Sequence, residues 1–394
     1  VPCMGIGAGQ AYLERDLLVS FSPAPLANVS PGVAAWGVFL CPFLFSHSPP
    51  RCRPPTHKEL DLSSTLPLTS AQYGVWNAQK LNPESPYYVV GEVLHLGPGH
   101  IELETLQHSI AQLQQEAETL RVRVTTDGLT PQQSVVQEGP GVDRVIDVRH
   151  AADPQRSAEA WVDALRAECA ETMRTMVDQP LCRYVIILLD VTETWVVQLY
   201  HHLIVDGFSA SLLTRRLSQI YTARVAGKQA RPFRAASLSE LVALDQEYRE
   251  SAEHIRDKQY WTSVLAQLPE VAERATMNTA TKAEGTGQTT ITTTMRLGPE
   301  IMEKATKAAT DEQITWVELM IALYGAFVHR LLAPRSTSEQ FLAVPVMARS
   351  HTRELRTPAM AVNVLPLRVN VDNQQTVQEY LHHAVESLHG LLAH

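Results

Sequence analysis

The sequence lacks the cysteine pattern of a metal-binding or disulfide-rich protein. Its five cysteines in 394 residues form no CxxC pair, so neither a zinc ribbon nor a disulfide framework is indicated. Reduced thiols of this kind are typical of a cytoplasmic protein. The histidines, including the adjacent His382 and His383, have no partners at metal-ligand spacing. We therefore expect no metal site and no directly bound cofactor.

The chain also lacks an excess of positive charge and a long apolar run. Its formal net charge is −9, so no basic stripe is available to replace the counterions of a nucleic acid. The most apolar stretch, residues 33–45, is interrupted by Pro42 and is shorter than the ~20 residues that cross a bilayer. It lies too far from the start for a signal peptide. We expect no nucleic-acid partner, no membrane span and a cytoplasmic location.

The composition is that of a globular protein with more than one domain. Hydrophobic residues make up 45% of the chain and charged residues 19%, which permits a sizeable core. The length suits two domains of roughly 100–200 residues each. Residues 1–62 mix proline-rich polar text with the short apolar stretch, and we interpret them as a poorly ordered leader.

From residue 63 onward the apolar pattern alternates between strand and helix periods. The expected helices cover about 69–80 with Thr69 or Ser70 as N-cap, 102–117, 153–176, 208–227, 237–267, 299–309, 316–332 and a terminal helix from Thr376. The expected strands cover about 87–96, 120–124, 183–191, 195–201, 291–297, 340–346 and 361–371. Strands and helices in both halves predict an α/β fold with two tandem subdomains.

A polar stretch rich in Thr, Ala and Gly separates the two halves. It has no apolar periodicity, and its core, residues 269–290, is the best linker candidate in the chain. We therefore predict an N-terminal subdomain over 63–268 and a partial C-terminal subdomain over 291–394.

The most informative motif is HHLIVDG at residues 201–207. It follows an apolar run, residues 195–200, that predicts a buried strand, and it precedes a helical pattern. Two histidines therefore stand where a strand leaves its sheet, a place where rigid backbone fixes a side chain and a loop keeps it accessible. We expect His202 to be the catalytic residue.

The chain resembles the condensation domains of nonribosomal peptide synthetases. HHLIVDG followed by Phe208 and Ser209 fits the family's double-histidine signature. Further stretches resemble the other family motifs in the expected order: LPLTSAQYGVW at 66–76, ETLRVRV at 118–124, PVMAR at 345–349 and VNVLPLR at 362–368. The sequence around residues 73–76, 116–120 and 363–366 is most similar to that of condensation domains from siderophore synthetases that accept an aryl donor.

The resemblance implies a fold and a set of partners. The fold is that of chloramphenicol acetyltransferase: two α/β-sandwich subdomains in a V arrangement, the second of them incomplete here because the family continues beyond this length. The substrates arrive on the 4′-phosphopantetheine arms of peptidyl or aryl carrier domains upstream and downstream, with an adenylation domain as a further partner. The reaction joins a carrier-bound acyl or aminoacyl thioester to the amine of a carrier-bound aminoacyl group.

The resemblance also implies roles for the motif residues. His202 acts on the acceptor amine as general base or as a hydrogen-bonding positioner. Asp206 pairs with an arginine and fixes the loop; because the second motif starts with Glu116, Ala117 and Glu118 where the family usually has Arg-His-Glu, that arginine is expected to be Arg121 or Arg123.

The remaining motif residues are expected to support the site. His201 is a structural neighbour, and Gly207 allows a turn that a side chain would block and could present its N–H to the reacting centre. Ser209 is an N-cap, or alternatively an oxyanion donor. Asn363 and Arg368 organise a strand of the second subdomain.

Three alternative functions are also compatible with parts of these motifs. An epimerization domain has the double histidine and needs a carboxylate base beside it. A CoA-dependent acyltransferase shares the HxxxDG core and the fold. The third alternative is not an enzyme: a fragment that only docks carrier domains.

Overall fold

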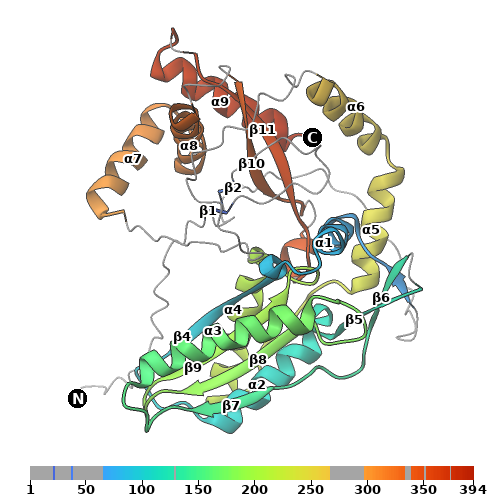
Figure 1. Cartoon of the computed structure of the whole chain (residues 1–394), viewed down its shortest axis with the longest axis vertical. Helices are drawn as coiled ribbons and strands as arrows, with labels where there is room; N and C mark the ends of the chain where they lie inside the picture. Colours follow the sequence, from blue (N-terminus) through green and yellow to red (C-terminus); the bar gives the residue numbers. More distant parts are fainter. Residues whose placement is uncertain are drawn as a thin grey trace, which may run out of the picture. The chain divides into compact units, whose positions relative to one another are not determined.

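The computed structural model describes residues 65–127, 130–266, 297–332, 339–349, 352–372 and 374–394, together with the two-residue strands β1 (Phe21–Ser22) and β2 (Gly37–Val38). The rest of the predicted leader, the linker over 269–290 and the strand over 291–297 apart from its last residue lie outside these residues. The described chain has the predicted α/β fold and groups into two compact units (Figure 1).

The units do not follow the sequence as simply as predicted. The first contains the described residues of Pro49–Gln246 and then the later segment Arg349–Ala361. The second contains β1, β2 and the described residues of Glu247–Ala348 and Val362–His394. A short piece of the second half of the sequence therefore belongs with the unit that carries the histidine motif.

The main sheet of the first unit holds the strand that leads into the histidine motif. Its order is β4 (Val89–Leu96), β9 (Thr194–His201), β8 (Cys182–Leu188) and β7 (Arg144–Asp147). The first three strands are antiparallel neighbours, and β7 joins β8 in parallel. Every residue of β9 is buried, because it is a central strand with both faces covered, which explains its continuous apolar run.

Helices cover both faces of this sheet. On one face, α3 (Pro154–Met173) packs Leu165 and Cys169 into a cluster with Val185 and Val197; Figure 1 shows this helix lying along the sheet. On the other face, Thr214 of α4 (Gly207–Val225) accepts a hydrogen bond from Gln198, which alternates with Val197 along β9. Helix α4 also contacts α2 (Leu103–Glu116).

A smaller sheet and a capped helix complete the first unit. The sheet has the order β3 (Leu66–Pro67), β6 (Pro131–Val135) and β5 (Val122–Thr126), of which the sequence indicated only part of β5. Helix α1 (Ser70–Leu81) begins at the predicted N-cap Thr69, which forms a capping box with Gln72. Short 3₁₀ turns over Pro86–Tyr88 and Glu118–Arg121 replace the beginnings of two predicted strands.

The single helix predicted over 237–267 is wrong. The chain forms α5 (Leu238–Glu250) and α6 (Ala252–Ala266), separated at Ser251. The predicted subdomain end at 268 also differs from the structure, because α6 packs with the second unit. Trp261 packs against the core of that unit and donates its indole N–H to the carbonyl of His394 at 3.1 Å, and Asp257 accepts from the His394 ring.

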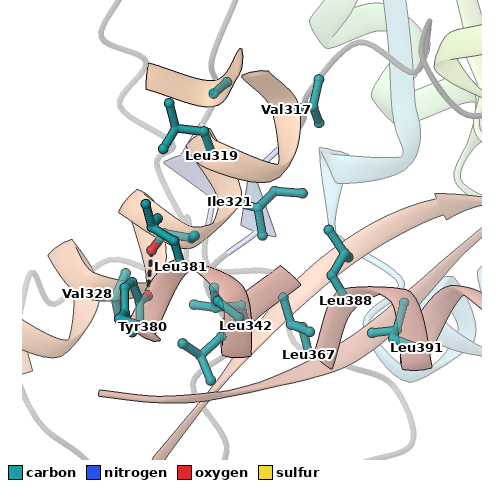
Figure 2. Packing of buried hydrophobic residues seen from close by; sticks show 14 residues of the cluster. Val317, Leu319, Ile321, Val328, Leu342, Leu367, Tyr380, Leu381, Leu388 and Leu391 are labelled. Atoms are coloured by element: carbon teal, nitrogen blue, oxygen red, sulfur yellow. Dashed lines mark hydrogen bonds between the residues drawn. The ribbon is translucent and has the colours of Figure 1, made fainter. Parts of the chain in front are cut away.

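The second unit contains a sheet of order β1-β2-β10-β11, in which the long strands β10 (Glu339–Met347) and β11 (Val362–Asn370) are antiparallel. Besides α6, its helices are α7 (Pro299–Asp311), α8 (Trp316–Leu332) and α9 (Val377–Leu392). Figure 2 shows leucine, isoleucine and valine side chains of β10, β11, α8 and α9 packed together. Within this cluster the buried Tyr380 donates its hydroxyl to the carbonyl of Ala322 at 2.6 Å, which satisfies its polar atom.

Candidate functional site

The two histidines stand at the end of β9, where the chain leaves the main sheet. Val89 of β4 lies opposite His201 in the ladder, and the N–H of His202 donates to the carbonyl of Tyr88 at 2.6 Å. His201 is buried and His202 is half-buried. The sheet therefore fixes the backbone of both residues; His202 as a whole is half-buried, and its ring Nδ1 is buried without a hydrogen-bond partner.

His201 has a packed, neutral ring. Its Nδ1 accepts the N–H of Leu203 at 3.1 Å, and the ring stacks on Tyr88 with centroids 6.3 Å apart. Burial, with a smaller contribution from the neighbouring His202, lowers the pKa of His201 from 6.5 to about 3. The ring is therefore neutral at pH 7 and does not serve as an imidazolium acid.

His202 is also neutral at pH 7. Burial lowers its pKa below 6.5, and the contact with its own main chain and the charge of Asp206 offset this only in part. A neutral imidazole has a lone pair with which to accept a proton or a hydrogen bond. The site therefore holds an acceptor ready for use at neutral pH.

The lowered pKa of both histidines gives a direct prediction. In protein labelled at histidine carbon, the Cε1–H resonance of His202, assigned by its loss in His202→Ala, should titrate with a midpoint below 6.5. The resonance of His201 should show no titration above about pH 5, since its pKa is about 3. A midpoint of 6.5 or higher for His202, or titration of His201 near neutral pH, would contradict the burial described here.

Asp206 braces the loop and begins the next helix. Its carboxylate forms a buried ion pair with Arg349, with Oδ2 at 2.8 Å from one guanidinium nitrogen and Oδ1 at 3.2 Å from the other. It also caps α4 by accepting the N–H of Ser209 at 2.8 Å, and it accepts the N–H of Ala361 at 3.0 Å. Asp206 is thus fully used by protein groups.

Arg121 and Arg123 are not the partners of Asp206, contrary to the sequence prediction. The Arg121 guanidinium donates to main-chain carbonyls, among them those of Gln114 at 3.1 Å and Val136 at 2.5 Å. Arg123 donates to the carbonyl of Val122 at 3.0 Å. The Arg121 guanidinium is occupied in joining the end of α2 to the β5–β6 hairpin, so the negative charge of Asp206 is met by Arg349 instead.

Ser209 is neither the N-cap nor a free oxyanion donor. Asp206 caps the helix, and the Ser209 hydroxyl is fully buried. The hydroxyl donates to the carbonyl of Ala359 at 2.7 Å and accepts from the N–H of Ala359 and from Arg349, both at 2.8 Å. It therefore fastens the Arg349–Ala361 segment to the start of α4.

Gly207 also differs from its prediction. It is exposed, it does not have a positive φ, and a Cβ added to it would meet nothing within 4 Å. The local backbone therefore does not require glycine. Its amide is the first of α4, one of the four at a helix start that no intrahelical carbonyl accepts.

Asn363 and Arg368 lie on β11 in the second unit, opposite Val346 and Phe341 of β10. The side chain of Asn363 is exposed, and its Oδ1 accepts the N–H of Val364 at 2.9 Å. The predicted residues that the structure brings together are thus those of the histidine motif, joined by Arg349.

Two side chains that the sequence analysis did not place in the site also reach the loop. Gln72 donates to the carbonyl of Leu203 at 3.2 Å, and Thr119 donates to the carbonyl of Ile204 at 2.5 Å. Both residues lie within motifs given in the sequence analysis, and this position was the only sequence evidence that they could matter to the site. The spacing of the motifs did not indicate which groups they contact.

The described residues contain neither a metal-binding cluster nor a membrane-spanning helix. No cluster of three His, Cys, Asp or Glu side chains there is arranged to hold a metal ion. No helix in the same part of the chain is long and apolar enough to cross a bilayer.

Fold and site together define an α/β protein with a neutral, half-buried histidine at the end of a central strand. Residues 63–394 match the family model described as Condensation domain. The chain belongs to this family, in the form found in nonribosomal peptide synthetases.

Curated relatives are much longer than this chain. It is 31% identical over 344 residues to a dimodular nonribosomal peptide synthase of Bacillus subtilis, covering 86% of this chain and 14% of the relative. It is 28% identical over 326 residues to enterobactin synthase component F of Escherichia coli O157:H7, covering 81% and 24%. The chain thus spans less than a quarter of either relative.

A solved structure supports the same family. The first condensation domain of the calcium-dependent antibiotic synthetase, in complex with a substrate analogue, is 28% identical with a TM-score of 0.70. The match covers 84% of this chain and 76% of that one.

Proposed function

We propose that this chain forms amide bonds in nonribosomal peptide synthesis. The donor is an acyl or aminoacyl thioester on one carrier domain, and the acceptor is the amine of an aminoacyl group on another. The observation that carries the proposal is His202, a neutral imidazole of a half-buried residue on a loop that an ion pair and main-chain bonds hold in place.

The chemistry needs a proton acceptor at this position. The amine nitrogen attacks the thioester carbonyl, the C–N bond forms, and the C–S bond of the tetrahedral intermediate then breaks. The amine loses a proton, which His202 accepts and the departing thiolate finally takes up. If His202 only orients the amine by a hydrogen bond, the same contact acts by proximity, an effect of up to ~7–11 kcal/mol on the barrier in well-oriented reactions.

The carriers and the donor are the finer part of the proposal. Thioester delivery on 4′-phosphopantetheine makes carrier domains the direct partners, and an adenylation domain loads them. A siderophore pathway with an aryl donor is favoured by the similarity of the motif text to siderophore synthetases and by enterobactin synthase component F among the relatives.

The test is an assay of the chain within its natural polypeptide, supplied with loaded donor and acceptor carriers and read by mass spectrometry of the carrier-bound product. A new carrier-bound amide is expected. A D-configured aminoacyl group without a new amide would instead identify an epimerization domain. Transfer from acyl-CoA alone would identify a CoA-dependent acyltransferase, and carrier binding without any product would identify a docking fragment.

A further inference from the structure

The loop that carries His202 is held by side chains from remote parts of the chain. After β9 ends, the sheet ladder no longer supplies partners for the main chain. Leu203 and Ile204 are almost completely buried, and a buried carbonyl without a partner is costly. Gln72 and Thr119 supply partners for these two consecutive carbonyls.

Both polar atoms of the Gln72 side-chain amide are fully hydrogen-bonded within the protein. Its Oε1 accepts the N–H of Thr69 at 2.9 Å and the amide of Gln133 at 2.8 Å. Its Nε2 donates to Gln133 at 2.9 Å and to the carbonyl of Leu203 at 3.2 Å. Gln72 and Gln133 are 4% and 0% exposed, so this reciprocal pair holds the amide in one orientation.

Gln72 and Thr119 together form what we call the clamp, two side chains that bond consecutive carbonyls of the histidine loop. Thr119 is its second member. It is 6% exposed and lies on the 3₁₀ turn Glu118–Arg121. That turn is itself fixed by the bonds of Arg121 to carbonyls at the end of α2 and in the β5–β6 hairpin. The position of the Thr119 hydroxyl, which bonds the carbonyl of Ile204, is therefore fixed by the turn.

We propose that Gln72 and Thr119 are positioning residues for His202. The N–H of His202 is fixed by Tyr88, and the clamp fixes the peptides that follow. Together these bonds determine where the imidazole lies. The inference rests on the proposed function, since positioning matters only if His202 acts on a substrate.

Gln72→Met tests the proposal, because methionine keeps the length of the side chain and removes its hydrogen bonds. We expect kcat for amide formation to fall about 10- to 100-fold, the cost of misplacing a reacting group by about 1 Å. The KM for the loaded carriers should change less than kcat. Thr119→Val, which is nearly isosteric, should lower kcat in the same way and serves if Gln72→Met does not fold.

Gln114→Met is the matched control. Gln114 is also a buried glutamine, 1% exposed, whose side-chain amide bonds the main chain of Gly141 instead of the histidine loop. Its main-chain carbonyl, which accepts from Arg121, is kept in the variant. It should lower the melting temperature about as much as Gln72→Met while kcat stays close to wild type. Equal kcat in the Gln72 and Gln114 variants would overturn the inference, provided that the wild type forms product; no wild-type product would overturn the proposed function instead.

A double-mutant cycle separates positioning from general loosening. In a His202→Ala background, Gln72→Met should change the residual single-turnover rate less than about twofold, because coupled residues are not additive. A loss of the same size in both backgrounds would mean that Gln72 acts without His202, and would also overturn the inference.

Discussion

Replacing His202 with alanine is expected to lower the rate of amide formation about 10²- to 10⁴-fold, the usual contribution of a general acid or base. The fold should survive, because the side chain is half-buried and the loop bonds at this position come from the main chain. The rate is measured with loaded carriers under single-turnover conditions, and the fold by a thermal melt.

His150→Ala is the control for this experiment, since that histidine is exposed in the same unit. It should leave both rate and melting temperature unchanged. Equal rates in wild type and His202→Ala would remove His202 from the chemistry and with it the mechanism proposed above.

The second large effect is expected at Asp206. Asp206→Asn keeps the shape and the helix cap but removes the charge, leaving Arg349 as an uncompensated charge whose side chain is 1% exposed. Breaking such a buried pair from one side costs about 3–5 kcal/mol of unfolding free energy. Urea denaturation followed by tryptophan fluorescence measures this loss.

Two further variants show whether the loss comes from burial of the charge. Arg349→Met added to Asp206→Asn should recover part of the stability, because no buried charge then remains. Glu240→Gln breaks the exposed ion pair with Arg353, whose side chains are 38% and 58% exposed, and should cost no more than about 1 kcal/mol. A similar small cost for Asp206→Asn would contradict its bracing role.

The buried pair also explains why one segment leaves its half of the sequence. Arg349 and the main chain of Ala359 and Ala361 are fastened to Asp206 and Ser209 of the first unit. Strands β10 and β11, on either side of this segment in the sequence, belong to the second unit. The link is polar and buried, and its partners are about 140–155 residues apart.

Local sequence signals predicted the local structure well. Apolar periodicity located β9, α2, α3, α8 and α9, since a period of two or 3.6 residues reflects which side of an element is buried. The local sequence also predicted the N-cap at Thr69 and the position of the histidine motif between a strand and a helix, because both depend on neighbours within a few residues. The break at Ser251 was not, since the apolar pattern runs through it.

The tertiary structure alone decided the partners of the site. The sequence contains several arginines near the motifs, and spacing could not distinguish Arg121 from Arg349 as the partner of Asp206. The same holds for Ser209, whose hydroxyl is used by a segment 150 residues away, and for Gln72, which reaches the loop across 131 residues. Periodicity determines which face of an element is buried, but only the packing of whole elements determines which buried polar groups meet.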